Sequence, residues 1–192
     1  MNTTERNVGG SDGARARGWW AQYCHPINGD PATRAQLRRC RTDAEVLTVP
    51  GGLALAERLG ALGRAPVPDE RLRMVLRLAR VLAHVKEYND RHPMRAVGWG
   101  GVPGDRKESD AGDKRPKLAE ARFRRLLQVE RGEEQVSAFA RLIAQMGDKV
   151  NVTTLARDFL RWDDATKERW AFEYYAAGSA APRSDNNSED GQ

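Results

Sequence analysis

Residues 69–88 read DERLRMVLRLARVLAHVKEY, and this stretch carries the longest helical pattern in the chain. Because an α-helix has 3.6 residues per turn, apolar side chains that recur every three or four residues fall on one face. In this stretch the recurring apolar residues are Leu72, Val75, Leu76, Ala79, Leu82 and Ala83. We therefore predict a helix from about Asp69 to Tyr88 that buries this face in a helical core.

Shorter helical patterns on both sides of this stretch predict the rest of the fold. The Asp-Pro pair at 30–31 is typical of an N-cap followed by proline in the first turn. No segment alternates apolar and polar residues over the length of a strand. The chain is therefore predicted to be all-α, a bundle of about eight helices. Besides the long one, helices are expected over residues 14–24, 30–40, 52–62, 117–129, 133–146, 152–162 and 165–177, with a further short segment at 43–49.

Composition divides the chain into a folded body and two tails. Residues 1–13 and 179–192 contain almost no large apolar side chains, so burial cannot repay the entropy of ordering them. Both tails are expected to be disordered. The body at 14–178 is expected to form a single domain in which a long loop, rich in glycine and proline, joins two sub-bundles. The first sub-bundle, the loop and the second sub-bundle span about 14–88, 89–116 and 117–178.

The sequence excludes several classes of protein. It has no run of about 18 uncharged apolar residues, so no membrane-spanning helix is expected. Its first residues are charged and lack an apolar segment, so no secretory signal is expected. Cys24 and Cys40 are the only cysteines, too few for a disulfide framework or a four-thiolate zinc site. We therefore expect a cytoplasmic protein.

The charge of the chain indicates a polyanionic partner. Lysine and arginine number 32 and aspartate and glutamate 27, which gives a formal net charge of +5. The two tails are acidic, so residues 14–178 alone carry +8. For a basic protein of the cytoplasm, nucleic acid is the polyanion expected first as a partner.

No combination of residues supports catalysis or a bound cofactor. Cys24, His25 and Cys40 lack the spacing of zinc ligands, and Cys40 is better explained as a small core residue. The stretch GWGGVPG at 98–104 resembles a phosphate-binding loop only in composition, because no strand precedes it and no Lys-Ser/Thr pair follows it. Asp163 and Asp164 fit the start of a helix. We therefore expect neither an enzyme nor a metal site.

Arginine recurs at helical spacing in four segments of the body. Rows at i, i+4 and i+7 occur within 34–41 and 73–80, an i, i+4 pair occurs at 157 and 161, and residues 114–131 carry a local charge of +5. Guanidinium groups bind phosphate through two parallel hydrogen bonds. Each row alone is better explained as a solvated helix face or as local salt bridges, but four of them together favour a groove that binds nucleic-acid backbone. The candidate residues are Arg34, Arg38, Arg39, Arg41, Arg73, Arg77, Arg80, Lys114, Arg115, Lys117, Arg122, Arg124, Arg125, Arg131, Arg157 and Arg161.

Aromatic residues of the C-terminal segment could in principle stack on bases. They fall on apolar helix faces, so core packing is the favoured interpretation of Trp162, Trp170, Tyr174 and Tyr175. Trp99 lies among glycines and is the aromatic residue that we expect to be exposed.

The order of these segments resembles the CasB family, the small subunit of the type I-E CRISPR surveillance complex Cascade. The resemblance covers about residues 14–178, and it departs from the family in a longer loop at 89–116 and in the acidic tail. Each motif is short, so their order, their spacing and the aromatic pair near the C-terminus carry the resemblance. The matching segments are GWWAQY (18–23), RAQLRRC (34–40), RLRMVLRLA (71–79), KLAEARFRRLLQVER (117–131), VNVTTLARDFLRW (150–162) and ERWAFEYY (168–175).

The resemblance implies an all-helical, non-catalytic subunit of Cascade without a cofactor. Such a subunit pairs with a second copy of itself and contacts the repeated backbone subunit and the large subunit. It presents a basic surface to the CRISPR RNA with its target DNA and to the displaced strand, and so stabilises the R-loop. Two alternatives remain at this stage: a free-standing helical DNA-binding protein and a purely structural interaction bundle.

Overall fold

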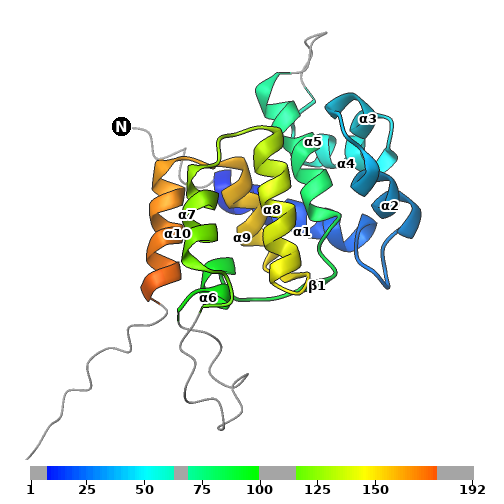
Figure 1. Ribbon diagram of the computed structural model, residues 1–192. Coiled ribbons are helices and arrows are strands. Elements are labelled where there is room, and N and C mark those ends of the chain that lie inside the picture. Colours follow the sequence, from blue (N-terminus) through cyan, green and yellow to red (C-terminus); the bar gives the residue numbers. More distant parts are fainter. Residues whose placement is uncertain (1–7, 63–68, 100–115, 177–192) are drawn as a thin grey trace, which may run out of the picture.

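In the computed structural model, residues 8–62, 69–99 and 116–176 are described, and they form a bundle of ten helices with one small sheet (Figure 1). The first five helices are α1 (Val8–Tyr23), α2 (Pro31–Arg39), α3 (Asp43–Leu47), α4 (Pro50–Arg58) and α5 (Glu70–Leu82). The others are α6 (Pro93–Val97), α7 (Glu120–Gln128), α8 (Glu133–Gln145), α9 (Val152–Leu160) and α10 (Asp164–Ala176). The all-α prediction is therefore confirmed. The sheet pairs β1 (Glu87–Tyr88) in parallel with β2 (Lys149–Val150).

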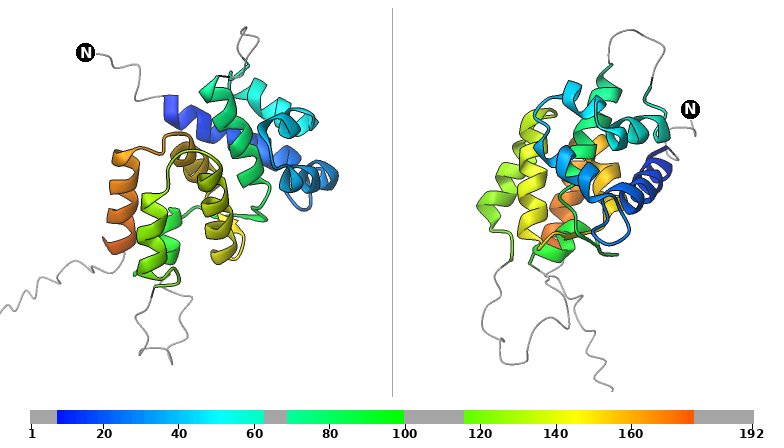
Figure 2. Two further views of the ribbon diagram at one scale, coloured as in Figure 1. Left: turned by 45° about the horizontal axis from the view of Figure 1, so that its top comes forward. Right: turned by 90° about the vertical axis from the view of Figure 1, so that its right-hand side faces the viewer.

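The predicted apolar face of the longest pattern lies at the centre of the core. On α5, Leu72, Val75, Leu76, Ala79 and Leu82 are all buried. This helix packs against α4 on one side and against α8 and α9 on the other, while α1 lies along α9 (Figure 2). One continuous hydrophobic core therefore joins the two halves that the sequence suggests as sub-bundles.

Helix α5 begins where the sequence predicts and ends earlier. The Asp69 side chain accepts a hydrogen bond from the Leu72 backbone N–H at 2.7 Å and caps the helix. After Leu82 the backbone turns, and the N–H groups of Lys86 and Glu87 both donate to the carbonyl of Asp148. The chain up to Tyr88 therefore joins the small sheet instead of continuing the helix.

The N-terminal helix starts before the predicted domain boundary. Helix α1 begins at Val8, and the side chain of Asp12 is buried and accepts a hydrogen bond from Arg71. Gly13 lies so close to α9 that a Cβ atom there would be 2.4 Å from the carbonyl oxygen of Thr153. The expected disorder of residues 1–13 is therefore wrong from residue 8 onward. Residues 1–7 and the tail at 179–192 lie outside the described residues.

The expected loop at 89–116 contains structure in its first part. His92 caps α6 by accepting a hydrogen bond from the Met94 N–H, and Met94 and Val97 are buried in the core. Gly98 then contacts α10, since a Cβ atom there would lie 2.3 Å from the carbonyl oxygen of Tyr174. The loop prediction is thus wrong for 93–97, and residues 100–115 are outside the described part.

Three further predictions about single residues are confirmed, for Asp30, Asp163 and Cys40. Asp30 caps α2, accepting from the Ala32 N–H at 2.9 Å, and Asp163 accepts from the Thr166 N–H beside the start of α10. Cys24 and Cys40 are buried and free, and burial raises the pKa of the Cys24 thiol to about 12. Such a thiol is not ionised at neutral pH and does not react as a nucleophile.

Candidate nucleic-acid interface

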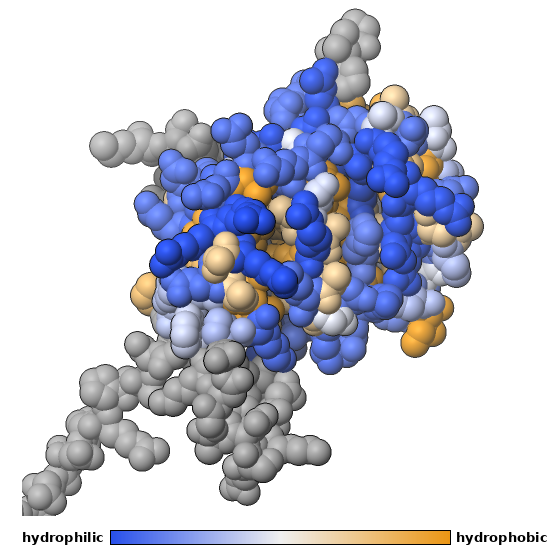
Figure 3. Space-filling view, viewed as in Figure 1, coloured by the Kyte–Doolittle hydropathy of each residue, from blue (hydrophilic) through white to orange (hydrophobic). Residues whose placement is uncertain are grey.

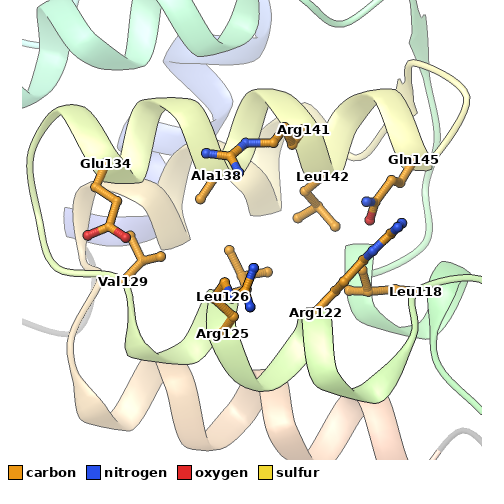
Figure 4. A pocket seen from close by; sticks show the side chains of 10 residues that line it. All are labelled: Leu118, Arg122, Arg125, Leu126, Val129, Glu134, Ala138, Arg141, Leu142 and Gln145. Carbon is orange, nitrogen blue, oxygen red and sulfur yellow. The ribbon is translucent and has the colours of Figure 1, made fainter.

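Three accessible arginines line a cleft between α7 and α8. Arg122 and Arg125 extend from α7 and Arg141 lies along α8, as Figure 4 shows. The cleft has a volume of about 380 Å³. Its floor and rim are completed by Leu118, Leu126, Val129, Glu134, Ala138, Leu142 and Gln145.

The amphipathic pattern of α7 explains how this cleft forms. Phe123 and Leu126 are buried, which turns Arg122 and Arg125 outward along the edge that faces α8. The two helices run antiparallel, so the start of α7 faces the end of α8 (Figure 4). The turn between them includes Gly132, whose φ of 136° is accessible to glycine and strained for other residues.

The electrostatics of the cleft favour an anion. Within the described ranges, Arg122, Arg125 and Arg141 form no ion pair with a carboxylate, and all three are exposed. The Nε of Arg141 donates to the Ser137 carbonyl at 3.1 Å, which orients the side chain without neutralising it. Glu134 is the one acidic residue in the lining. In the space-filling view, strongly hydrophilic side chains surround small apolar areas over α7 and α8 (Figure 3).

A second group of cations gathers beyond the end of α7. Arg131 donates from Nε to the carbonyl of Trp162 at 3.3 Å, and Arg161 is exposed next to that tryptophan in the chain. The Nζ of Lys167 lies 5.9 Å from the centre of the Trp162 ring. The fold therefore brings together Arg131 and Arg161, which belong to separate patterns in the sequence.

The row on α5 does not form the expected outward line. Arg73 is exposed, but the side chains of Arg77 and Arg80 are only 14% and 10% exposed. Arg80 binds Glu133 at 2.8 Å, and Arg77 contacts Glu133, Asp43 and Glu70 at 3.3–3.6 Å. The expectation of one outward-facing row is therefore corrected, because these two guanidinium groups connect α5 to α3 and α8.

Arg157 is also engaged inside the protein. Its Nε donates to Asp158 at 2.8 Å, and the same carboxylate accepts from Arg169 and from the indole N–H of Trp170. Burial alone would raise the pKa of Asp158, but the neighbouring His92 and the hydrogen bonds from Arg157 and Trp170 outweigh it and lower the pKa below 3.8. Arg157 thus neutralises a buried charge.

The basic residues of α2 occupy a separate surface. Arg34 donates from Nε to the carbonyl of Ala83 at 3.1 Å, while Arg38, Arg39 and Arg41 are exposed. Desolvation and the charge of Arg38 lower the pKa of the nearby His84. Helices α2 and α7 lie at opposite ends of the bundle, with α5 and α8 between them (Figure 1). The four basic segments therefore do not line a single groove.

The remaining candidates belong to the segment before the cleft and to α7 itself. Lys117 is exposed and precedes Leu118, a lining residue of the cleft, while Arg124 is exposed but forms an i, i+4 ion pair with Glu120. Lys114 and Arg115 lie outside the described residues.

Sequence reasoning missed Arg141 and Lys167. Arg141 is the only cation of α8, and Lys167 shares α10 only with Arg169 at i+2, so neither has a second cation at i+3 or i+4 and helical periodicity provides no signal for them. Their place beside Arg122, Arg125 or Arg131 results from helix packing. Among the described residues no group of histidine, cysteine, aspartate and glutamate could hold a metal ion, and no helix is both long and apolar enough to cross a membrane.

Fold and site together define an all-α protein with basic surfaces at both ends of a single core. The family model of CRISPR-associated protein Cse2 matches residues 33–175. The chain therefore belongs to the Cse2 family, also called CasB, and the resemblance seen in the sequence motifs is confirmed.

One solved structure contains a chain of the same fold. It is the crystal structure of E. coli Cascade bound to a PAM-containing double-stranded DNA target. The two chains share 18% sequence identity with a TM-score of 0.54, and the match covers 86% of this chain and 94% of the other. At this identity the match supports the fold alone. A comparison with curated proteins finds no match.

Proposed function

We propose that this chain is the non-catalytic small subunit of a type I-E Cascade complex. In this role it binds the backbone of the guide RNA and target DNA and stabilises the displaced strand and the R-loop. The observation that carries the proposal is the cleft between α7 and α8, in which three exposed guanidinium groups face one carboxylate in a chain of the Cse2 family. The shared fold with a chain of DNA-bound Cascade supports it.

The chemistry of the cleft suits binding that ignores base sequence. Arginine forks bind phosphate oxygens, which are the same at every nucleotide. Replacing a DNA duplex with an RNA–DNA duplex is nearly balanced in free energy, so a few phosphate contacts are enough to shift it toward the open state. At about 1 kcal/mol for each charge-assisted contact, Arg122, Arg125 and Arg141 together are sufficient for such a shift.

The proposal includes the assembly. The partners are the repeated backbone subunit, the large subunit and a second copy of this chain, in the cytoplasm and without a membrane. The proposed role is a binding role and includes no catalytic step.

The test is charge reversal in the assembled, guide-loaded complex. Arg122→Glu combined with Arg125→Glu should leave assembly intact, since both side chains are exposed on α7. Opening of the target duplex should fall about tenfold or more. The reactivity of unpaired thymines in the displaced strand measures this opening. Circular dichroism establishes that the variant keeps its helices.

The matched control reverses Arg58 and Arg91, which are exposed on other parts of the surface, and changes the net charge by the same amount. It should open the target like the unchanged protein. If the variant with Arg122 and Arg125 reversed also opens the target like the unchanged protein, the cleft does not bind nucleic acid and the chain has a purely structural role there. A repressor would instead bind one short duplex sequence tightly without any Cascade subunit.

A further inference from the structure

Exposed aromatic side chains gather around the C-terminal half of α10. Phe172 is 68% exposed and Tyr175 is 43% exposed, and Trp99 follows at 38%. Large aromatic side chains usually bury most of their surface. Tyr175 thus differs from its predicted place in the core, whereas the core positions of Trp162, Trp170 and Tyr174 are confirmed.

The packing of Tyr174 explains how Tyr175 and Trp99 come to the same end of α10 as Phe172. Its ring stacks on Phe123 with centroids 4.0 Å apart, and its hydroxyl donates to the Leu118 carbonyl at 2.6 Å. Burial of Tyr174 turns the next residue, Tyr175, outward. The backbone N–H of Trp99 donates to the carbonyl of Tyr174 at 3.1 Å, which holds Trp99 at the same end of α10.

Cations of α7 border this aromatic edge. The hydroxyl of Tyr175 donates to Glu120 at 3.1 Å, and Arg124 pairs with the same carboxylate while its side chain stays 70% exposed. A second carboxylate, Glu173, is paired with Arg95. Since α7 carries Arg122 and Arg125 on its other side, the aromatic edge and the cleft flank the same helix (Figure 1).

We propose that Trp99, Phe172 and Tyr175 form a stacking edge for unpaired bases of a single nucleic-acid strand whose phosphates contact α7. This rests on the proposed backbone binding and adds the chemical class of the ligand to it. Aromatic rings stack on the face of any base, and they do so without reading its sequence. Bases in a duplex already stack on their neighbours, so the edge selects single strands.

Charge and continuity favour a nucleic acid over a protein at this edge. Glu120, which accepts from Tyr175, and Glu173, which follows Phe172 in the chain, are each paired with an arginine, so neither repels a phosphate strongly. The neighbouring cleft offers three guanidinium groups without an ion-pair partner in the described ranges. A strand that crosses α7 can therefore use both surfaces.

The experiment compares two oligonucleotides of equal length and charge, one of thymidines and one of abasic residues. The full-length protein should bind the thymidine strand about tenfold more tightly, the ratio that corresponds to ~1.4 kcal/mol of stacking. Phe172→Ala combined with Tyr175→Ala should lose this preference while keeping the affinity for the abasic strand. Equal binding of both strands by the unchanged protein, or a preference that survives the double substitution, overturns the proposal.

Three comparisons separate this proposal from the proposed function. Charge reversal of Arg122 and Arg125 should weaken binding of both strands equally. If binding of both strands is unchanged and the preference for thymidine persists, the proposed backbone binding at the cleft is wrong, while the stacking edge is still supported. Ile27→Ala removes a remote side chain that is 85% exposed and should leave the affinity for both strands unchanged. If the aromatic double variant keeps its base preference and instead fails to join the other Cascade subunits, the edge is a protein contact and the proposal is wrong.

Discussion

Nη1 of Arg80 donates to both carboxylate oxygens of Glu133, each at a distance of 2.8 Å. The pair connects α5 to the first turn of α8, and Arg77 contacts the same carboxylate from one turn earlier. Arg80 therefore stabilises the junction between the two halves of the bundle. Its guanidinium group is only slightly accessible to a phosphate.

Arg80→Met should lower the free energy of unfolding by about 2 kcal/mol, because it removes one partner of a pair that is buried on the arginine side and half-exposed on the glutamate side. Arg73→Met, on the same helix but exposed, should change it by less than about 0.5 kcal/mol. Urea unfolding followed by circular dichroism measures both. Equal effects of the two substitutions would show that the ion pair contributes nothing.

Asp158→Asn should destabilise the protein by about 2–3 kcal/mol at neutral pH. The carboxylate is fully buried and accepts hydrogen bonds from Arg157, Arg169 and Trp170, so its replacement leaves two cations without their counter-charge. The exposed Asp164→Asn at the start of α10 is the control, with an expected loss of at most about 0.5 kcal/mol. Thermal and urea unfolding give the two values.

The contribution of Asp158 should depend on pH in a defined direction. Its folded pKa is below the ordinary value of 3.8, so the folded state holds fewer protons there than the unfolded chain. The stabilisation from the Asp158 carboxylate is complete above the unfolded pKa of 3.8 and is lost as the pH falls through the lower pKa of the folded state. The difference in unfolding free energy between the unchanged protein and Asp158→Asn should therefore be constant above about pH 5 and shrink below 3.8. A difference that grows on acidification would contradict this assignment.

Two glycines of α1 should respond oppositely to alanine. At Gly13 a Cβ atom would meet the backbone oxygen of Thr153 at 2.4 Å, so Gly13→Ala should cost about 1–3 kcal/mol by forcing α1 away from α9. At Gly18 the nearest atom is the end of a flexible side chain, that of Arg58, at 3.5 Å. Gly18→Ala should therefore gain up to about 1 kcal/mol from helix propensity. Unfolding midpoints of the two variants decide whether α1 is packed from its first turns.

Arg141→Gln should reduce the salt dependence of single-strand binding. If Arg141 neutralises one phosphate, the slope of log affinity against log salt should fall by about 0.7. Arg58→Gln, at an exposed arginine on α4, should leave the slope unchanged. Fluorescence anisotropy over a series of salt concentrations measures both, and an unaltered slope for Arg141→Gln would remove this residue from the interface.

The sequence by itself determined most of the helices and the family. Helical periodicity and capping act within about four residues, so the apolar face of α5, the Asp30 cap and the Asp69 cap could be predicted without knowledge of the fold. The exposure of Arg122 and Arg125 follows from the same local pattern, because Phe123 and Leu126 define the buried side of α7. The order of the motifs was sufficient to indicate the family that residues 33–175 match.

Tertiary structure alone decided which cations remain available. Glu133 lies 53 residues from Arg80 in the chain, and Arg169 reaches Asp158 only across the turn between α9 and α10, so no pattern within one helix could identify these pairs. Helix packing also places Arg141 opposite Arg125 across the cleft. The same kind of packing brings Gly13 of α1, a helix that begins at Val8, into close contact with α9. For the arginines the physical reason is the same in each case. An arginine is charged wherever it lies, but whether its charge meets a carboxylate or solvent depends on which other segments the fold places beside it.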